Sequence, residues 1–123
     1  MIGEQILCYL PGKAGLASLV KSVCAAQDVV FTPVAPGQTG ERLGVLLGLP
    51  MPPQKTAPAL PPAGGVLVLH GFSRGRMETL LDALRAAGLG PEVLKAMTTP
   101  TNLGWSFAAL CAELAREHSE LNK

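Results

Sequence analysis

The sequence is poor in charge and lacks the short signatures of common catalytic and metal sites. Only 15 % of its 123 residues are charged, the net charge is +1, and the basic residues are scattered. Without a basic stripe, we expect no nucleic acid and no membrane surface as partner. The two histidines have no further histidine, cysteine or carboxylate at ligand spacing, so we expect no metal and no cofactor.

Cysteines and long apolar runs are also scarce. Cys8, Cys24 and Cys111 lie in apolar runs, show no CxxC spacing and are odd in number, so we interpret them as small buried hydrophobes in a reducing compartment, with a metal or redox role as the alternative. No apolar run reaches about 18 residues, and the N-terminus lacks the pattern of a signal peptide. We therefore expect a soluble, cytoplasmic protein.

What the chain does have is apolar residues, which make up 48 % of it. A chain of this length is expected to form one domain and to bury about 60 to 70 % of the surface it exposes when unfolded. Residues 50–64 are rich in proline and show no periodic apolar pattern, so we interpret them as a linker that lies against the body. It separates a first half, residues 1–49, from a second half, residues 65–123.

Both halves show the same order of signals. Each begins with a continuous apolar run typical of a buried strand, continues through a helical pattern with apolar residues three and four apart, and reaches a second strand that ends at a proline. The predicted strands are residues 5–10, 29–35, 65–72 and 92–99, and the closing prolines are Pro36 and Pro100. We interpret this as an internal duplication of a β-α-β-α unit. Chance similarity between two amphipathic units is the alternative.

The strands differ in composition, which predicts their order. The first and third are uniformly apolar and belong in the centre of a sheet. The second contains Pro33, which cannot donate to a ladder, and the fourth contains Glu92 and Lys95, so both suit an edge. The fold class is therefore α/β: a four-stranded, mainly parallel sheet in the order 2-1-3-4 with helices on both faces.

Ligands of such sheets bind where the carboxyl ends of the strands meet, above a switch point that we expect between strands one and three. Four polar or glycine-rich loops, residues 10–15, 36–40, 70–75 and 99–102, are predicted to converge there. The candidate ligand-binding residues are Lys13, His70, Lys95, Thr99, Thr101, Asn102 and Trp105. Lys95 forms a donor-rich patch with Thr98, Thr99 and Asn102 that could hold an anion or a carbonyl group.

Several of these residues also have a plain structural interpretation. Lys13 precedes a helix, where phosphate binds, but the P-loop pattern is incomplete and a strand-to-helix turn is the simpler interpretation. His70 could be a general base or a neutral hydrogen-bonded imidazole. Ser73 is expected to cap the helix that follows, and Gly88 to end it. His118 is expected to be a cation at a helix C-terminus or a half-buried packing residue.

The segment Thr99–Trp105 is the most unusual part of the second half. Thr101 and Asn102 favour a turn, and Ser106 is expected to cap the last helix. Trp105 is placed to act as a hydrophobic staple, and its truncation would cost about 3 to 5 kcal/mol if the ring is buried.

Residues 65–118 resemble a family of small bacterial proteins known only as a domain of unknown function. The resemblance rests on Gly71-Phe72, Lys95-Ala96, the turn Thr99-Pro100-Thr101-Asn102, Trp105, and Glu117-His118. It implies the fold and the importance of the turn, and it implies no reaction.

These observations favour a non-enzymatic, self-associating binding or regulatory module that recognises a small anion or a partner protein. The alternative is a small hydrolase or transferase at the carboxyl ends of the strands. It would use His70 as base, with Lys95 and Asn102 holding a substrate oxyanion, and it requires these side chains to share one cavity.

Overall fold

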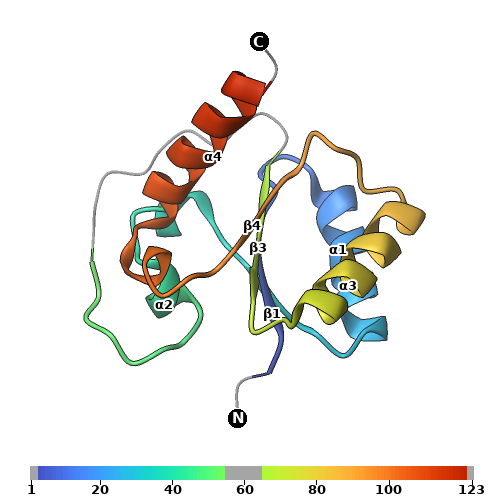
Figure 1. Ribbon diagram of the computed structural model, residues 1–123, viewed down its shortest axis with the longest axis horizontal. Coiled ribbons are helices and arrows are strands. Elements are labelled where there is room, and N and C mark those ends of the chain that lie inside the picture. The colour runs from blue at the N-terminus through green and yellow to red at the C-terminus, as the bar shows by residue number, and fades with distance from the viewer. Residues whose placement is uncertain (1–2, 55–64, 122–123) are drawn as a thin grey trace.

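The computed structural model describes residues 3–54 and 65–121. Both halves contain a strand, a helix, a second strand, a 3₁₀ turn and a second helix, in that order (Figure 1). The elements of the first half are β1 (Gln5–Tyr9), α1 (Ala14–Ala26), β2 (Val30–Pro33), η1 (Pro36–Gln38) and α2 (Leu43–Leu46). Those of the second half are β3 (Val66–His70), α3 (Arg74–Ala87), β4 (Leu94–Met97), η2 (Asn102–Gly104) and α4 (Phe107–Leu121). A common origin of the halves stays a prediction.

The four strands form one mixed α/β sheet in the predicted order β2-β1-β3-β4. The outer pairs, β1 with β2 and β3 with β4, are parallel, whereas the central pair is antiparallel, with Leu7 opposite Val68. The carboxyl ends of β1 and β2 therefore lie at one end of the sheet and those of β3 and β4 at the other. The predicted common edge and its switch point are wrong. Apolar composition specified which strands are central but carried no information on their direction.

Helices cover both faces of the sheet, as predicted. Figure 1 shows α1 and α3 on one side of it and α2 and α4 on the other. Side chains alternate along β1, so that Ile6 and Cys8 join the core beneath α1 and α3, whereas Leu7 and Tyr9 join the core beneath α2 and α4. In the second core the ring of Tyr9 meets that of the fully buried Phe107 edge to face, with 5.4 Å between ring centroids.

The two halves also meet outside the sheet, just before their second helices. Arg42 and Ser106 form an antiparallel bridge, in which the Leu43 N–H donates to the Trp105 carbonyl (2.9 Å) and the Phe107 N–H to the Glu41 carbonyl (2.8 Å). The reciprocal bonds and the antiparallel central pair together relate the halves by an approximate two-fold axis. The segments that open α2 and α4 are thereby fixed against each other.

The helix caps follow the sequence closely. The Oγ of Ser73 accepts the N–H of Arg76 (3.2 Å) at the start of α3, and Gly88 ends that helix with φ 115°. The Oγ of Ser106 accepts the N–H of Ala109 (3.0 Å) at the start of α4. These three caps are confirmed.

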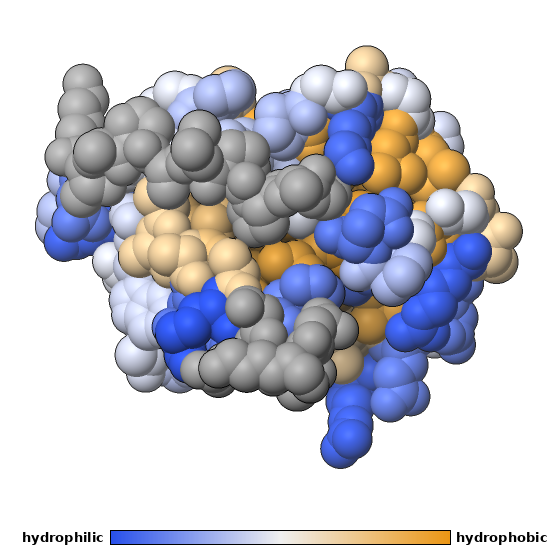
Figure 2. Space-filling model, turned by 90° about the horizontal axis from the view of Figure 1, so that it is seen from above, coloured by the Kyte–Doolittle hydropathy of each residue, from blue (hydrophilic) through white to orange (hydrophobic). Residues whose placement is uncertain are grey.

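The linker predicted at residues 50–64 is described only up to Gln54. Its residues Pro52 and Gln54 are hydrogen-bonded to Arg42 and Glu41 of the body, and residues 55–64 fall outside the described residues. Among the residues that are described, no helix combines the length and the apolar character needed to cross a bilayer. Figure 2 shows the end of the molecule toward which α4 runs, where hydrophobic residues reach the surface between hydrophilic ones.

Candidate functional site

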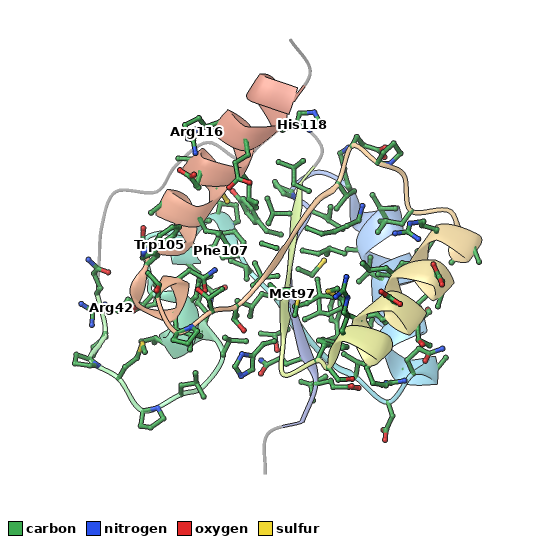
Figure 3. The ribbon with its side chains drawn as sticks, viewed as in Figure 1. Arg42, Met97, Trp105, Phe107, Arg116 and His118 are labelled. Atoms are coloured by element: carbon green, nitrogen blue, oxygen red, sulfur yellow. The ribbon has the colours of Figure 1, made fainter. Side chains whose placement is uncertain are left out.

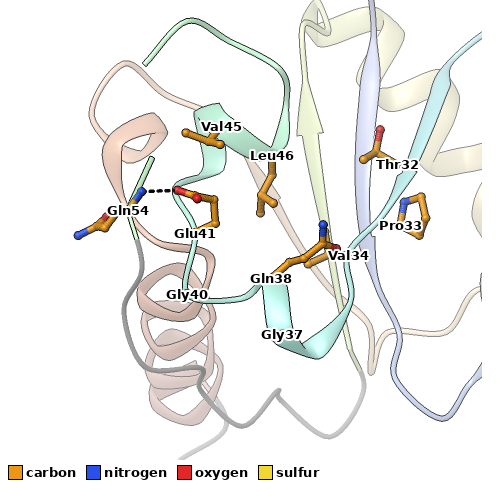
Figure 4. A pocket seen from close by; sticks show the side chains of 10 residues that line it. All are labelled: Thr32, Pro33, Val34, Gly37, Gln38, Gly40, Glu41, Val45, Leu46 and Gln54. Carbon is orange, nitrogen blue, oxygen red and sulfur yellow. Dashed lines mark hydrogen bonds between the residues drawn. The ribbon is translucent and has the colours of Figure 1, made fainter. Parts of the chain in front are cut away.

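A cavity in the described part of the chain lies between the edge strand β2 and the segment η1–α2 (Figure 4). Its volume is about 600 Å³, within the range of ligand sites, which is about 300 to 1,000 Å³. We call it the first cavity. It is lined by Thr32, Pro33, Val34, Gly37, Gln38, Gly40, Glu41, Val45, Leu46 and Gln54.

One wall of the first cavity is the short segment after α2. The Oε1 atom of Glu41 accepts the backbone N–H of Gln54 (2.7 Å) and that of Arg42 (2.8 Å). The Arg42 guanidinium donates from Nε to Gln54 Oε1 (3.2 Å) and from Nη1 to the Pro52 carbonyl (3.1 Å). Glu41 and Arg42, neighbouring residues of opposite charge, thus hold residues 52–54 in place. Among the described residues of the lining, Glu41 is the only charged one.

The opposite wall is held by the sheet and by the 3₁₀ turn. The Thr32 hydroxyl oxygen accepts the side-chain amide of Gln5 (2.8 Å), so its own proton can be donated toward the cavity. The Gln38 Oε1 atom accepts the N–H of Ala35 (2.8 Å) and closes the turn η1. The first cavity therefore combines polar groups, whose positions are fixed by hydrogen bonds to other parts of the protein, with the apolar side chains of Val45 and Leu46.

A second cavity of about 380 Å³ lies across the bridge between the halves. It is lined by Gln54, Gly104, Trp105, Ser106, Ala109 and Glu113. Trp105 is the only sequence-predicted ligand-binding residue that lines either cavity. Its side chain points away from the sheet while Phe107 points toward it (Figure 3), and 37 % of Trp105 is exposed. The large stability loss expected for truncation of Trp105 assumed a buried ring, and Trp105 is not buried.

The two residues required to cooperate in catalysis lie on opposite faces of the sheet. His70 follows Val68 on the face covered by α2 and α4, and its Nδ1 lies 2.9 Å from the Thr98 hydroxyl. Lys95 lies beside Leu67, whose side chain belongs to the core under α1 and α3. Burial lowers the pKa of Lys95, and the nearby Arg85 lowers it further. His70 and Lys95 therefore do not share a cavity, and this requirement of the enzyme hypothesis is wrong.

The Thr-Pro-Thr-Asn turn is held together by its own side chains. Asn102 is buried, its Oδ1 accepts the Thr99 N–H (2.7 Å), and its Nδ2 donates to the Met97 carbonyl (3.0 Å). The Thr99 hydroxyl in turn accepts the Asn102 N–H (3.0 Å), while the side chain of Thr101 is exposed. Gln38 makes the equivalent bond in the first half: its side-chain oxygen accepts the N–H of Ala35, three residues earlier, as that of Asn102 accepts the N–H of Thr99. The groups expected to hold an anion are thus largely used within the turn.

The remaining predicted residues lie elsewhere. Lys13 is the N-cap residue of α1, after Gly12 with φ 75°, at the end of the sheet opposite His70. His118 lies exposed in the last turn of α4, which agrees with the helix-end prediction and not with half-burial. No group of three or more potential metal ligands occurs among residues 3–54 and 65–121.

The three cysteines are buried and free, as predicted. Burial raises the pKa of the Cys8 and Cys111 thiols to about 12 and that of Cys24 to about 11. At neutral pH these thiols are protonated, and the protonated thiol is a poor nucleophile and a poor metal ligand.

Sequence reasoning named the loop 36–40 but missed most of the first cavity. Thr32, Glu41, Val45 and Leu46 belong to an edge strand and a four-residue helix, and nothing in their local pattern distinguishes them from core or surface. One signal was available: aligned on Pro36 and Pro100, Gln38 occupies the place of Asn102.

Residues 65–121 match the family model described as "Domain of unknown function (DUF3783)". No curated protein and no solved structure matched the chain. The resemblance of the second half to an uncharacterised family is therefore confirmed, while a bacterial source and the turn as a family signature stay predictions.

Proposed function

We propose that the protein is a non-catalytic binding module whose site is the first cavity. The observation that carries this proposal is a ligand-sized cavity with a mixed lining. Val34, Val45 and Leu46 supply apolar surface, and Thr32 and Glu41 supply polar groups whose positions are fixed by hydrogen bonds. A few fixed polar groups in an apolar lining are typical of binding sites.

Two further observations favour binding over catalysis. His70 and Lys95 lie on opposite faces of the sheet, so they cannot act on one substrate. The cysteine thiols, the strongest nucleophiles in the chain, are buried and protonated. Neither group lines the first cavity.

The charge of the lining bears on the kind of partner. Glu41 is the only charged residue in the described part of the lining, and a carboxylate attracts cations and repels anions. The proposal therefore favours a neutral or cationic partner group over the small anion expected from the sequence. Cytoplasmic location and self-association remain part of it, and the exposed Val30, Met97 and Trp105 offer apolar surface to a partner.

The test is a substitution that fills the first cavity. Val45→Trp places a large ring in the lining, and the control Ala109→Trp makes the same change at the corresponding position of the second half, on the exposed side of α4. We expect some members of a panel of small metabolites and short peptides to raise the Tm of the wild type and of Ala109→Trp, because a ligand stabilises the state that binds it. Val45→Trp should show no such rise.

Equal rises in wild type and Val45→Trp would place the binding elsewhere and refute the site. A wild-type Tm that no member of the panel raises would refute the binding proposal itself.

A further inference from the structure

The strand that forms one wall of the first cavity has an unpaired outer edge. β2 pairs with β1 alone among the described residues. The N–H groups of Val30 and Val34 donate to Glu4 and Cys8, so they point toward β1. In a parallel ladder the alternate residues point the other way. The N–H and carbonyl of Phe31 and the carbonyl of Pro33 therefore face outward.

The opposite edge of the sheet differs at the corresponding place. On β4 the carbonyl of Met97 accepts the side-chain amide of Asn102, which occupies one of the two outward carbonyls of that edge. In the first half the corresponding residue is Gln38, whose Oε1 accepts the N–H of Ala35. In the described part of the chain its side-chain amide donates no hydrogen bond to the carbonyl of Pro33, the residue of β2 that corresponds to Met97. The two halves are alike in topology, but among the described residues only β2 keeps both outward carbonyls without a hydrogen-bond donor.

The open edge and the first cavity are continuous. Pro33 of β2 and the adjoining Val34 line the cavity, and Val30 on the same strand is 53 % exposed. A chain laid along β2 would alternate its side chains between the two faces of the sheet. Every second side chain would then point toward the face that carries Val45 and Leu46.

We propose that the occupant of this site is an extended segment of another protein, which adds to the sheet as a further strand beside β2. Its backbone accepts one hydrogen bond from the Phe31 N–H and donates two, to the carbonyls of Phe31 and Pro33. One apolar side chain enters between Val45 and Leu46, and a basic side chain near it complements Glu41. This inference rests on the proposed function of the first cavity and names its class of partner.

The test begins with the full chain and a phage-displayed library of random peptides of about ten residues, the upper end of ordinary strand length. We expect enriched peptides with apolar residues at alternate positions and a lysine or arginine beside them. Synthetic versions should bind wild type and Ala109→Trp but not Val45→Trp. Methylation of single backbone nitrogens should weaken binding about tenfold at alternate positions, because each methyl group removes one hydrogen bond to β2.

The other outcomes separate the inference from the proposed function. If small metabolites raise the Tm of the wild type but not of Val45→Trp, and no peptide is enriched, the cavity binds small molecules and strand addition is refuted. Peptides that bind but tolerate N-methylation at every position refute strand addition as well. If sedimentation shows a dimer that Val45→Trp abolishes and that no peptide displaces, the occupant is a second copy of the chain. If neither peptides nor metabolites bind, both proposals fall.

Discussion

Replacing Asn102 by alanine tests whether the Thr-Pro-Thr-Asn turn is a structural device or an anion site. Asn102 is 8 % exposed, and its side chain makes two hydrogen bonds, with the Thr99 N–H (2.7 Å) and the Met97 carbonyl (3.0 Å). Alanine removes both and leaves the two backbone groups without these partners. If the turn is structural, the protein loses stability even when no ligand is present.

The size of the loss follows from the number of bonds. A hydrogen bond contributes about 0.5 to 1.5 kcal/mol net, so two contribute about 2 kcal/mol to the free energy of unfolding. For a chain of this length, that loss corresponds to a decrease in Tm on the order of 8 °C. The matched control is Gln38→Ala, which removes the single bond to Ala35 from an exposed residue and should cost about 0.5 to 1 kcal/mol.

The assay is urea unfolding of wild type, Asn102→Ala and Gln38→Ala, followed by circular dichroism. Asn102→Asp adds a further comparison, because it keeps the acceptor for Thr99 and loses the donor to Met97. An Asn102→Ala protein that unfolds within about 0.5 kcal/mol of wild type, the range of ordinary surface substitutions, would refute the structural account. The anion hypothesis for this turn would then regain support.

Three further predictions concern packing, pH and thiol chemistry. Phe107→Ala should cost about 3 to 5 kcal/mol in urea unfolding, because Phe107 is fully buried, and Trp105→Ala should cost less than half as much; equal losses would contradict the exposure of Trp105. Hydrogen bonds from Arg76 lower the pKa of Glu4, so their ion pair should stabilise the fold above the unfolded-state pKa and lose that effect as the pH falls through the lowered one. Urea unfolding at pH 2 to 7 should therefore show a weaker acid dependence for Glu4→Gln, and an unchanged profile would refute the assignment. Because burial raises every cysteine pKa to about 11 or 12, a thiol reagent at pH 8 should react only as fast as the chain unfolds; rapid reaction of the folded protein would contradict this.

Much of the fold could be predicted because burial shows directly in composition. The uniformly apolar runs at β1 and β3 are the central strands, and Pro33 marks an edge strand, since a proline cannot complete a ladder. The caps at Ser73, Gly88 and Ser106 were predictable because each depends on a local chemical requirement. In these cases the physical cause lies within a few residues of its effect.

The loops predicted to form one site do not converge, because strand direction decides which loops meet at the same end of the sheet. The antiparallel pairing of β1 with β3 separates the loop at Lys13 from the loops at His70 and Thr99, and no local pattern specifies that pairing. The first cavity was missed for a different reason: it depends on where α2 packs, and that helix has only four residues. Glu41 became a candidate only when its contacts with Gln54 were known.

The pairing of β1 with β3 has a consequence for the order in which the chain folds. The contacts of β1 with β2, and of β3 with β4, close short loops within one half, whereas the central pair joins residues such as Leu7 and Val68 that are distant in sequence. Loop-closure entropy favours the local pairs, so we expect the central pair to form late. During synthesis the first half leaves the ribosome before the second half, so one edge of β1 stays unpaired until β3 has been synthesised.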